Sequence, residues 1–419
     1  MKFKNSVITD EPVQGLSTFV VPTQVKDVIT ISGSMLGGML FSNNNKISSL
    51  TSSMLDKGTR NKSKHEINNQ LESIGAEISF ISSNRHINFT AHCLKPDLDT
   101  VVQLIAEQLR EAVFPEDELD ILKKRIIANL EISKDDTKKQ ALVNFIREIY
   151  PEGHYNSRNT IDQAIKNIDV LKTDDLVSFH EKTFGLGSLK IAAAGDISND
   201  LFSGLIKTHF DGWKDQTVKQ LEQSVSSIKR KQSSLNKNIN DKTSTDIYIG
   251  QTVELSESSE DYLSLMMGIY ILGGNFSARL MQTVRDEQGL TYGIGSTLAG
   301  CSYGINGHWH TWGTFAPDLV DKGIASTLEQ IKKWYDNGIS KEELDAKKTT
   351  INGLFKVSLD TTGGVIDKIL TNAEKGREIT YLDNYTKLIS ELDKNKVNEV
   401  INKYIDPDKF TTSISGSIA

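Results

Sequence analysis

The stretch Asp117-Glu118-Leu119-Asp120 recurs later in the chain as Glu342-Glu343-Leu344-Asp345, at an offset of 225 in the numbering. In each copy a lysine and then an isoleucine follow at the same spacing: Lys123, Ile126, Lys348 and Ile351. The local pattern is that of a helix that begins with acidic residues, which the helix dipole favours at that end. One such match could be chance, so the flanking segments decide whether the fold is repeated.

The segments on either side of these copies match as well. Before them, Pro96-Asp97-Leu98 and Pro317-Asp318-Leu319 each open a segment whose apolar residues recur at the spacing of one helix face. After them, each half closes with a predicted helix and then a strand that runs into a glycine, Gly195 or Gly416. Both of these matches share an offset of 221 in the numbering. Matches in the same order at a nearly constant offset indicate a duplicated domain of roughly 200 residues.

Strand-like runs alternate with long helical stretches within each half. In the first half the runs are Phe19–Ser32, Ile78–Cys93 and Leu189–Ala194. The pattern predicts an α+β fold with two homologous domains, each a mixed or antiparallel sheet with helices packed on one face. We expect the domains at residues 1–215 and 242–419. The segment 216–241 is polar and nearly free of large apolar residues, so we expect it to be a linker.

The composition argues against several classes of protein. The 419 residues include 48 Lys and Arg against 55 Asp and Glu, and a net charge of −7 is unlike that of a nucleic-acid-binding protein. No apolar run reaches the roughly 18 residues that span a bilayer. No apolar segment follows Met1–Asn5, so we expect a cytoplasmic protein, with a processed periplasmic chain as the alternative. Cys93 and Cys301 are expected to be buried thiols.

Common catalytic motifs are absent from the sequence. It has no phosphate-binding loop, no dinucleotide-binding glycine motif and no nucleophile elbow. None of its eight histidines lies in H-E-x-x-H or H-x-x-E-H. The one local cluster, His308-Trp309-His310, would place two imidazoles on one face of a strand. A metal-binding pair is one interpretation; the favoured one is a polar sheet face with Trp309 and Trp312 on the other side.

Two longer stretches resemble one known family. The first is Ser53–Arg60 with Leu71–Ile78, and the second is Ile271–Leu280 with Val284–Tyr292. They are similar to the pitrilysin/insulinase-like zinc peptidases, in particular to the branch that includes mitochondrial processing peptidase and its two-subunit bacterial relatives. The resemblance extends over nearly the whole chain, the duplication included, and the second stretch is the more specific.

The resemblance implies a zinc motif, H-x-x-E-H, at the start of the first stretch. In this chain the motif positions carry Ser49, Ser52 and Ser53. A hydroxyl is a poor zinc ligand beside imidazole or carboxylate, and Ser52 cannot act as a general base. The third ligand of the family, a glutamate, would fall near residues 128–130, close to Glu131. We therefore expect that this chain binds no metal and no other cofactor.

Arg285 and Tyr292 match a second feature of this branch. Some of its enzymes consist of two chains, and the chain without the zinc motif contributes an Arg and a Tyr to the shared active site. Their chemistry fits, because a guanidinium can donate to substrate carbonyls and a phenol to an oxyanion. Gly289 would allow a sharp turn from helix to strand. From the residues alone, the alternative is that Arg285 pairs with Asp286 or Glu287 and Tyr292 packs in a strand.

The resemblance implies a non-catalytic subunit of a heterodimeric zinc metallopeptidase. The zinc would be held by a homologous partner that carries H-x-x-E-H, and the substrate would be a peptide. Two alternatives are a stand-alone pseudopeptidase that binds peptides or acts as a scaffold, and a peptidase that is active alone. We expect no nucleic acid and no membrane span. A co-purifying zinc-motif chain would favour the first interpretation, and stoichiometric zinc in this chain would favour the last.

Overall fold

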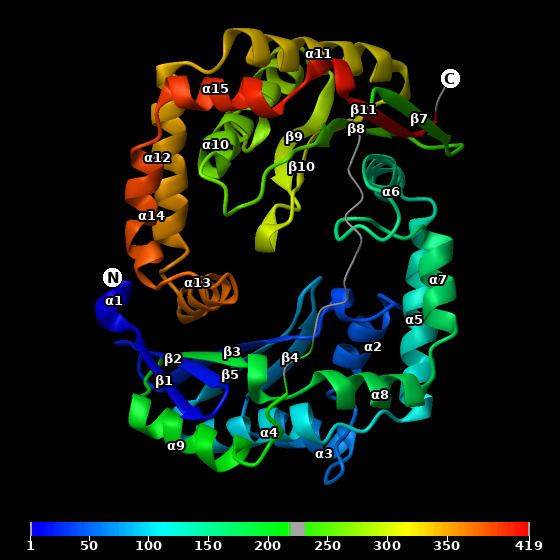
Figure 1. Ribbon diagram of the computed structural model, residues 1–419. Helices are drawn as coiled ribbons and strands as arrows, with labels where there is room; N and C mark the ends of the chain where they lie inside the picture. Colours follow the sequence, from blue (N-terminus) through cyan, green and yellow to red (C-terminus); the bar gives the residue numbers. More distant parts are fainter. Residues whose placement is uncertain (1, 217, 219–230, 418–419) are drawn as a thin grey trace. The chain divides into compact units, whose positions relative to one another are not determined.

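The structure, a computed structural model, describes residues 2–216, 218 and 231–417. The chain forms two compact units, each built from three segments. The first unit comprises Met1–Ile127, Ala164–Glu222 and Leu354–Tyr385. The second unit comprises Ala128–Gln163, Gln223–Gly353 and Thr386–Ala419. Figure 1 traces the elements of both units in sequence colours.

The first unit is built on a six-stranded sheet in the order β1-β2-β6-β3-β5-β4. Its strands are β1 (Ile8–Val13), β2 (Leu16–Pro22), β3 (Val28–Leu36), β4 (Glu77–Ser82), β5 (His86–Leu94) and β6 (Lys190–Gly195). Strands β2 and β6 run parallel, and the other neighbours run antiparallel. Its helices and short turns are α1 (Phe3–Ser6), η1 (Met39–Phe41), α2 (Ile47–Met54), α3 (Lys64–Ser73), η2 (Lys95–Asp97), α4 (Leu98–Arg110), α8 (Thr173–Thr183), η3 (Leu186–Ser188), α9 (Asn199–Phe210) and α13 (Thr362–Glu374).

The second unit is built on a five-stranded sheet in the order β7-β11-β8-β10-β9. Its strands are β7 (Ser233–Asn238), β8 (Thr245–Thr252), β9 (Thr291–Ala299), β10 (His308–Phe315) and β11 (Thr411–Gly416). Strands β7 and β11 run parallel, and the other neighbours run antiparallel. Its helices and short turns are α6 (Thr137–Ile149), α10 (Tyr262–Gly273), the π-helix η4 (Met281–Glu287), η5 (Ser302–Gly304), η6 (Pro317–Leu319), α11 (Val320–Asn337), α15 (Lys394–Tyr404) and η7 (Pro407–Lys409).

Some helices contain residues of both units. They are α5 (Glu116–Ser133), α7 (Ile161–Asp169), α12 (Lys341–Val357) and α14 (Thr380–Ser390). The repeated acidic stretches open α5 and α12. Each of these two helices is followed by a helix of 13 residues, α6 or α13. The first residues of α6 and α13, Thr137 and Thr362, have the same offset in the numbering as the acidic stretches.

The helices α6 and α13 are exchanged between the two halves of the sequence. Helix α6, from the first half, packs on β8 and β11, whereas α13, from the second half, packs on β3 and β6. Helix α13 lies on the face of its sheet opposite α4 and α9, and α6 lies on the face of its sheet opposite α11 and α15 (Figure 1). All eight residues of β8 are consequently buried. The predicted α+β fold with two mixed sheets is confirmed, with the correction that helices cover both faces of each sheet.

The units differ from the domain ranges that the sequence suggested, 1–215 and 242–419. Residues 128–163 belong to the second unit and residues 354–385 to the first, because each exchanged helix buries its apolar face on the other sheet. The linker expected at 216–241 lies partly outside the described residues. Within it, β7 is an edge strand beside β11. Its polar side chains are mostly exposed, which is why its composition resembled that of a linker.

The repeated glycines have the same structural role in both units. Gly195 and Gly416 end the equivalent strands β6 and β11, with φ of +140° and +152°. A Cβ atom on Gly195 would lie 2.1 Å from the carbonyl oxygen of Val28, and one on Gly416 would lie 2.6 Å from the Cα of Thr245. Only glycine fits this close approach of two strands.

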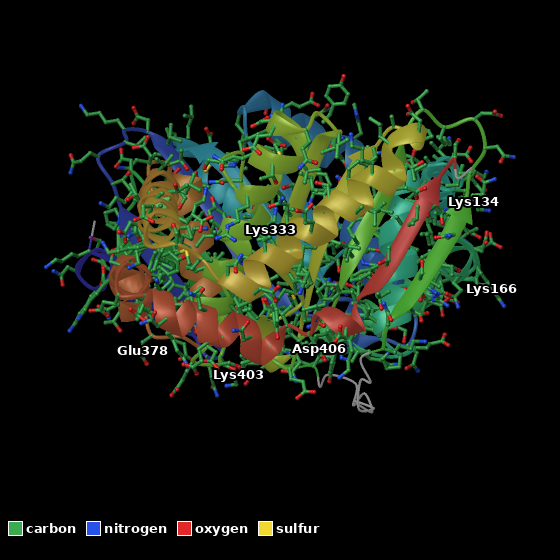
Figure 2. The ribbon with its side chains drawn as sticks, turned by 90° about the horizontal axis from the view of Figure 1, so that it is seen from above. Lys134, Lys166, Lys333, Glu378, Lys403 and Asp406 are labelled. Carbon is green, nitrogen blue, oxygen red and sulfur yellow. The ribbon has the colours of Figure 1, made fainter. Side chains whose placement is uncertain are left out.

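The helix surfaces carry many charged side chains, such as Lys333 on α11 and Lys403 on α15 (Figure 2). None of the helices within residues 2–216, 218 and 231–417 is long and apolar enough to cross a bilayer. Both cysteines are buried free thiols, as predicted. Burial raises the pKa of Cys93 to about 11 and that of Cys301 to about 12, so both are protonated near neutral pH.

Candidate functional site

The three serines at the zinc-motif positions lie on α2. Ser52 is buried, and Ser49 and Ser53 are half-buried. The Ser49 hydroxyl donates a hydrogen bond to the carbonyl oxygen of Lys46 (2.9 Å), and the Ser52 hydroxyl donates to that of Ser49 (3.1 Å). Such bonds to the preceding turn occupy hydroxyls without engaging a ligand. None of the eight residues of α2 is ionisable.

The residues around α2 do not match the donor set of a zinc site. Zinc in proteins takes thiolate, imidazole or carboxylate ligands. In the described part of the chain, nowhere do three His, Cys, Asp or Glu side chains gather in a way that could hold a metal ion. Glu131, the carboxylate nearest to the expected third-ligand position, lies on α5 and pairs with Lys134 at 2.8 Å.

Arg285 and Tyr292 flank the turn that connects η4 to β9. The Gly289 amide donates to the carbonyl oxygen of Arg285, and the Leu290 amide donates to that of Val284, both at 3.0 Å. Gly289 has φ of +63°, a conformation that glycine adopts without strain. The turn thus ends the helix and starts the strand within a few residues, at the place where the sequence suggests a sharp turn.

The two side chains differ in their surroundings. Tyr292 is 97% exposed and does not pack in the sheet. Arg285 pairs with Asp286 at 2.9 Å, which is the ion pair expected from the residues alone. That pair is partly exposed, and pairs of this kind contribute only about 0–1 kcal/mol, so a ligand can displace it at little cost. A bare phenol and a weakly held guanidinium can both donate hydrogen bonds to an incoming group.

Phe276 is an exposed aromatic residue near Arg285, and the sequence assigned it no role. It lies in the loop between α10 and η4 and is 78% exposed. The Arg285 guanidinium carbon lies 6.0 Å from the centre of its ring, at the outer limit of a cation–π contact. The signal in the sequence was an aromatic residue in the otherwise small and polar run Gly273–Ala278. We refer to Phe276, Arg285 and Tyr292 as the Arg/Tyr surface.

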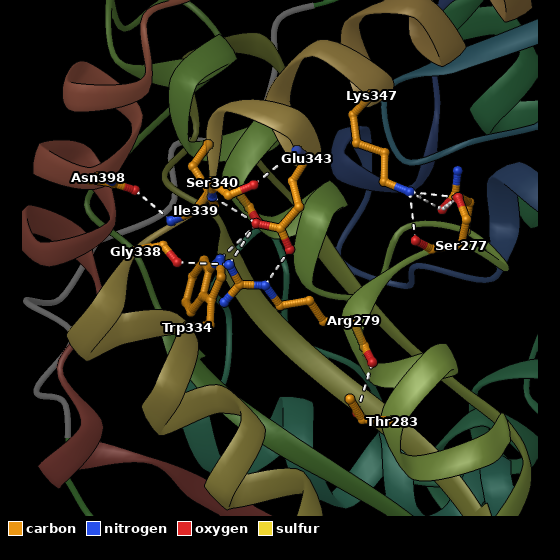
Figure 3. Close-up of polar contacts among 12 residues, drawn as sticks. Ser277, Arg279, Thr283, Trp334, Gly338, Ile339, Ser340, Glu343, Lys347 and Asn398 are labelled. Carbon is orange, nitrogen blue, oxygen red and sulfur yellow. Dashed lines mark hydrogen bonds and ion pairs between the residues drawn. The ribbon is translucent and has the colours of Figure 1, made fainter. Parts of the chain in front are cut away.

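An ion pair fixes the segment that leads into η4. Arg279 donates to both carboxylate oxygens of Glu343 on α12, at 2.5 and 2.6 Å, and to the carbonyl oxygen of Gly338 at 2.8 Å (Figure 3). The Ser340 amide also donates to the carboxylate of Glu343. A two-point arginine–carboxylate contact holds direction as well as distance. The start of η4 is therefore tied to the start of α12.

The histidines of β10 form a buried polar face under α6. His308 shares a hydrogen bond with the Tyr150 hydroxyl (3.0 Å), and the His308 and His310 rings stack at 5.2 Å. Burial lowers the pKa of His310 to about 4, so it is neutral near pH 7. The sequence favoured a polar face with Trp309 and Trp312 on the other side of the strand, and the position of Trp312 was wrong. Trp312 shares the histidine face, where Lys138 lies 3.6 Å from its ring centre, because residues 308, 310 and 312 alternate together on a strand.

Comparison with known proteins places these observations in a family context. Residues 41–159 match the family model described as "Insulinase (Peptidase family M16)", and residues 171–351 match the one described as "Peptidase M16 inactive domain". The non-peptidase homolog YmxG of Helicobacter pylori is 20% identical over 382 residues, which cover 90% of this chain and 86% of the homolog. An uncharacterized zinc protease of Streptomyces coelicolor is 20% identical over 319 residues, or 75% of this chain and 69% of that protein.

Solved structures share the whole fold. A peptidase M16 inactive domain from Pseudomonas fluorescens has a TM-score of 0.87 at 20% identity and covers 99% of this chain and 98% of its own. A protease from Helicobacter pylori has a TM-score of 0.81 at 17% identity, covering 98% of this chain and 99% of its own. At these identities the likeness shows the fold alone.

Proposed function

Because this chain belongs to the insulinase family, peptidase family M16, and carries serine at the three zinc-motif positions, we propose that it is the non-catalytic subunit of a heterodimeric zinc metallopeptidase. The observation that carries the proposal is the contrast in exposure within this one chain. The motif serines Ser49 and Ser52 bond to backbone carbonyls of the preceding turn, whereas Tyr292, seven residues after Arg285, is 97% exposed. An exposed phenol is free to donate a hydrogen bond to another molecule, which is the role that the proposal gives it.

In this proposal Arg285 and Tyr292 complete an active site whose zinc and general base belong to the partner. The guanidinium of Arg285 would leave Asp286 and donate to a carbonyl of the bound peptide. The phenol of Tyr292 would donate to the oxygen that becomes negative as the peptide bond is attacked. The peptide itself would extend a sheet edge, mainly on the partner.

A second candidate function belongs to a different class. The relative from Helicobacter pylori is described as a non-peptidase homolog, and a chain of that kind could bind peptides or act as a scaffold with no catalytic partner. The Arg/Tyr surface would then serve binding alone. The two functions differ in whether a second chain with H-x-x-E-H is required.

Co-purification separates the two functions. The full chain with an affinity tag, produced in its native cell, is expected to bring down one companion of similar size that carries H-x-x-E-H, and the pair is expected to cleave peptides. A chelator is expected to stop this cleavage, and the companion alone is expected to cleave poorly. A homodimer with no companion would contradict the subunit proposal and favour the scaffold.

A further inference from the structure

Lys347 on α12 is a lysine whose burial needs an explanation. Its side chain is only 4% exposed, and burying an ammonium group costs free energy unless acceptors replace water. The ammonium nitrogen donates to Asn275 Oδ1 (2.9 Å), to the Ser277 hydroxyl (2.7 Å) and to the Ser277 carbonyl oxygen (2.9 Å; Figure 3). All three acceptors belong to one loop, Asn275–Ser277. Burial lowers the pKa of Lys347, while the charge of Glu343 acts to raise it.

The first half of the chain shows what this helix position requires. At the offset of the acidic repeat, the counterpart of Lys347 is Leu122, which is 3% exposed. A hydrocarbon side chain therefore satisfies the packing of this position. The neighbouring ion pair has a counterpart in the first half, because Glu118 binds Lys64 at 2.8 Å as Glu343 binds Arg279. The charge of Lys347 has no such counterpart, which indicates that it serves the loop.

The loop that Lys347 holds carries the exposed ring of Phe276. Residues on both sides of Phe276 accept hydrogen bonds from Lys347, and the next residues lead through Arg279 into η4. The ring is thereby kept outside the core and 6.0 Å from the Arg285 guanidinium carbon. Fixing a loop in this way reduces the entropy that binding would otherwise cost.

We propose that Lys347 is a positioning residue of the Arg/Tyr surface and that it presents Phe276 as the contact for an apolar side chain of the bound peptide. This inference rests on the proposed function. In the proposed function, Arg285 and Tyr292 donate hydrogen bonds to the peptide backbone and contact no substrate side chain. The exposed ring of Phe276 supplies the apolar contact that can distinguish one peptide from another.

The test uses the complex purified with the tagged full chain, in wild type and in the variants Lys347→Met and Phe276→Ser. Lys348→Met, which removes a charge from the next position of α12, is the matched control. Hydrogen exchange of the amides at 275–278 is measured on the chain alone, and cleavage of a randomised peptide library is measured on the complex. Phe276 is 78% exposed, so the folding of Phe276→Ser is not in question.

We expect Lys347→Met to speed exchange in the loop about tenfold or more, because the loop loses its hydrogen bonds to a charged donor. It should raise KM about tenfold while kcat changes less than about twofold, a split that general destabilisation would not produce. Phe276→Ser should lower kcat/KM about tenfold for peptides with an apolar residue at one position, and little for those with serine there. Lys348→Met should behave as wild type.

Unchanged exchange in Lys347→Met would overturn the positioning role, and an unchanged cleavage preference in Phe276→Ser would overturn the contact role. A wild-type chain with no companion and no cleavage would instead contradict the proposed function, and the contact role of Phe276 with it. The two failures are distinguishable, since loop exchange is read on the chain alone.

Discussion

Helix α2 in the first unit and the turn from η4 to β9 in the second hold the two sets of site positions in this chain, but they carry opposite kinds of surface. On α2 the three predicted zinc-motif positions carry serines, and the hydroxyls of Ser49 and Ser52 donate to backbone carbonyls of the preceding turn. At the turn, Tyr292 is almost fully exposed and Arg285 forms a partly exposed ion pair with Asp286. The difference teaches that the same chain ties the hydroxyls of Ser49 and Ser52 to backbone carbonyls at one set of predicted positions and leaves a phenol exposed to solvent at the other.

The loops beside the two sites are both held by a buried charge, but the signs differ. In the first unit, Glu107 accepts hydrogen bonds from Thr59 (2.5 Å) and Lys62 (2.6 Å). Burial acts to raise the pKa of Glu107, but the hydrogen bonds from Lys62 and Thr59 outweigh it and lower the pKa. In the second unit the cation Lys347 holds the loop. The two halves therefore share a fold but hold these loops with charges of opposite sign. A substitution in one half can be compared with its counterpart in the other.

The largest effect on stability is expected at Gly195 and Gly416, which have the same role in both halves. Gly195→Ala and Gly416→Ala should each reduce the free energy of unfolding by about 3 kcal/mol or more, because a Cβ atom would overlap the neighbouring strand at a φ that favours glycine. Urea titration measures the change. Gly204→Ala on α9, where a Cβ atom meets nothing within 4 Å, should stabilise slightly. A harmless substitution at either strand end would break the equivalence of the two sheets.

The next effect is on catalysis and should affect one half alone. Tyr292→Phe should lower kcat of the reconstituted complex on the order of 10²-fold, because an oxyanion donor is lost. Single-turnover kinetics with a peptide substrate measure it, with chain association checked separately. Ser52→Ala on α2 serves as the control and should leave kcat unchanged. Full activity in Tyr292→Phe would remove the proposed role of the phenol and favour the scaffold function.

The sequence predicted the duplication but not the exchange of helices. Apolar periodicity identifies a helix face, yet it does not say which sheet that face will cover, so α6 and α13 read as members of their own halves. The polar strand β7 read as a linker for a related reason, because an exposed edge strand has few apolar residues. Apolar patterns along the chain do not show which sheet a helix packs on or which strand an edge strand pairs with.

The roles of the candidate site residues stay a prediction. The resemblance selected Ser49, Ser52, Ser53, Arg285 and Tyr292 by position, whereas the hydrogen bonds of the serines and the exposure of Tyr292 required the fold. Lys347 could not have been identified, since a lysine in a charged helix normally reads as a solvated residue.

A smaller effect tests the exchanged helices directly. Thr137 at the start of α6 donates to the carboxylate of Asp246 (2.6 Å), while Thr362 at the start of α13 shares a hydrogen bond with Thr30 (2.7 Å). Thr30 and Asp246 are equivalent, because each pairs with the residue before the repeated glycine. Thr137→Val should cost about 2 kcal/mol of unfolding free energy, since a buried charge loses a partner, and Thr362→Val only about 1 kcal/mol. Equal costs by urea titration would mean that the carboxylate makes no difference between the halves.

The smallest effect on stability is expected at the serine positions of α2. Ser49→Ala and Ser52→Ala should change the free energy of unfolding by no more than about 0.5 kcal/mol, because alanine favours the helix and the lost hydrogen bonds run only to the preceding turn. Elemental analysis of the purified chain should find far less than one zinc per chain, and a chelator should leave its melting temperature unchanged. Stoichiometric zinc whose removal lowers that temperature would show that the chain has a metal site built from other donors. The contrast between serine positions on α2 that bind no metal and the exposed Arg/Tyr surface would then fail. The reason for assigning the zinc to a partner would fail with it.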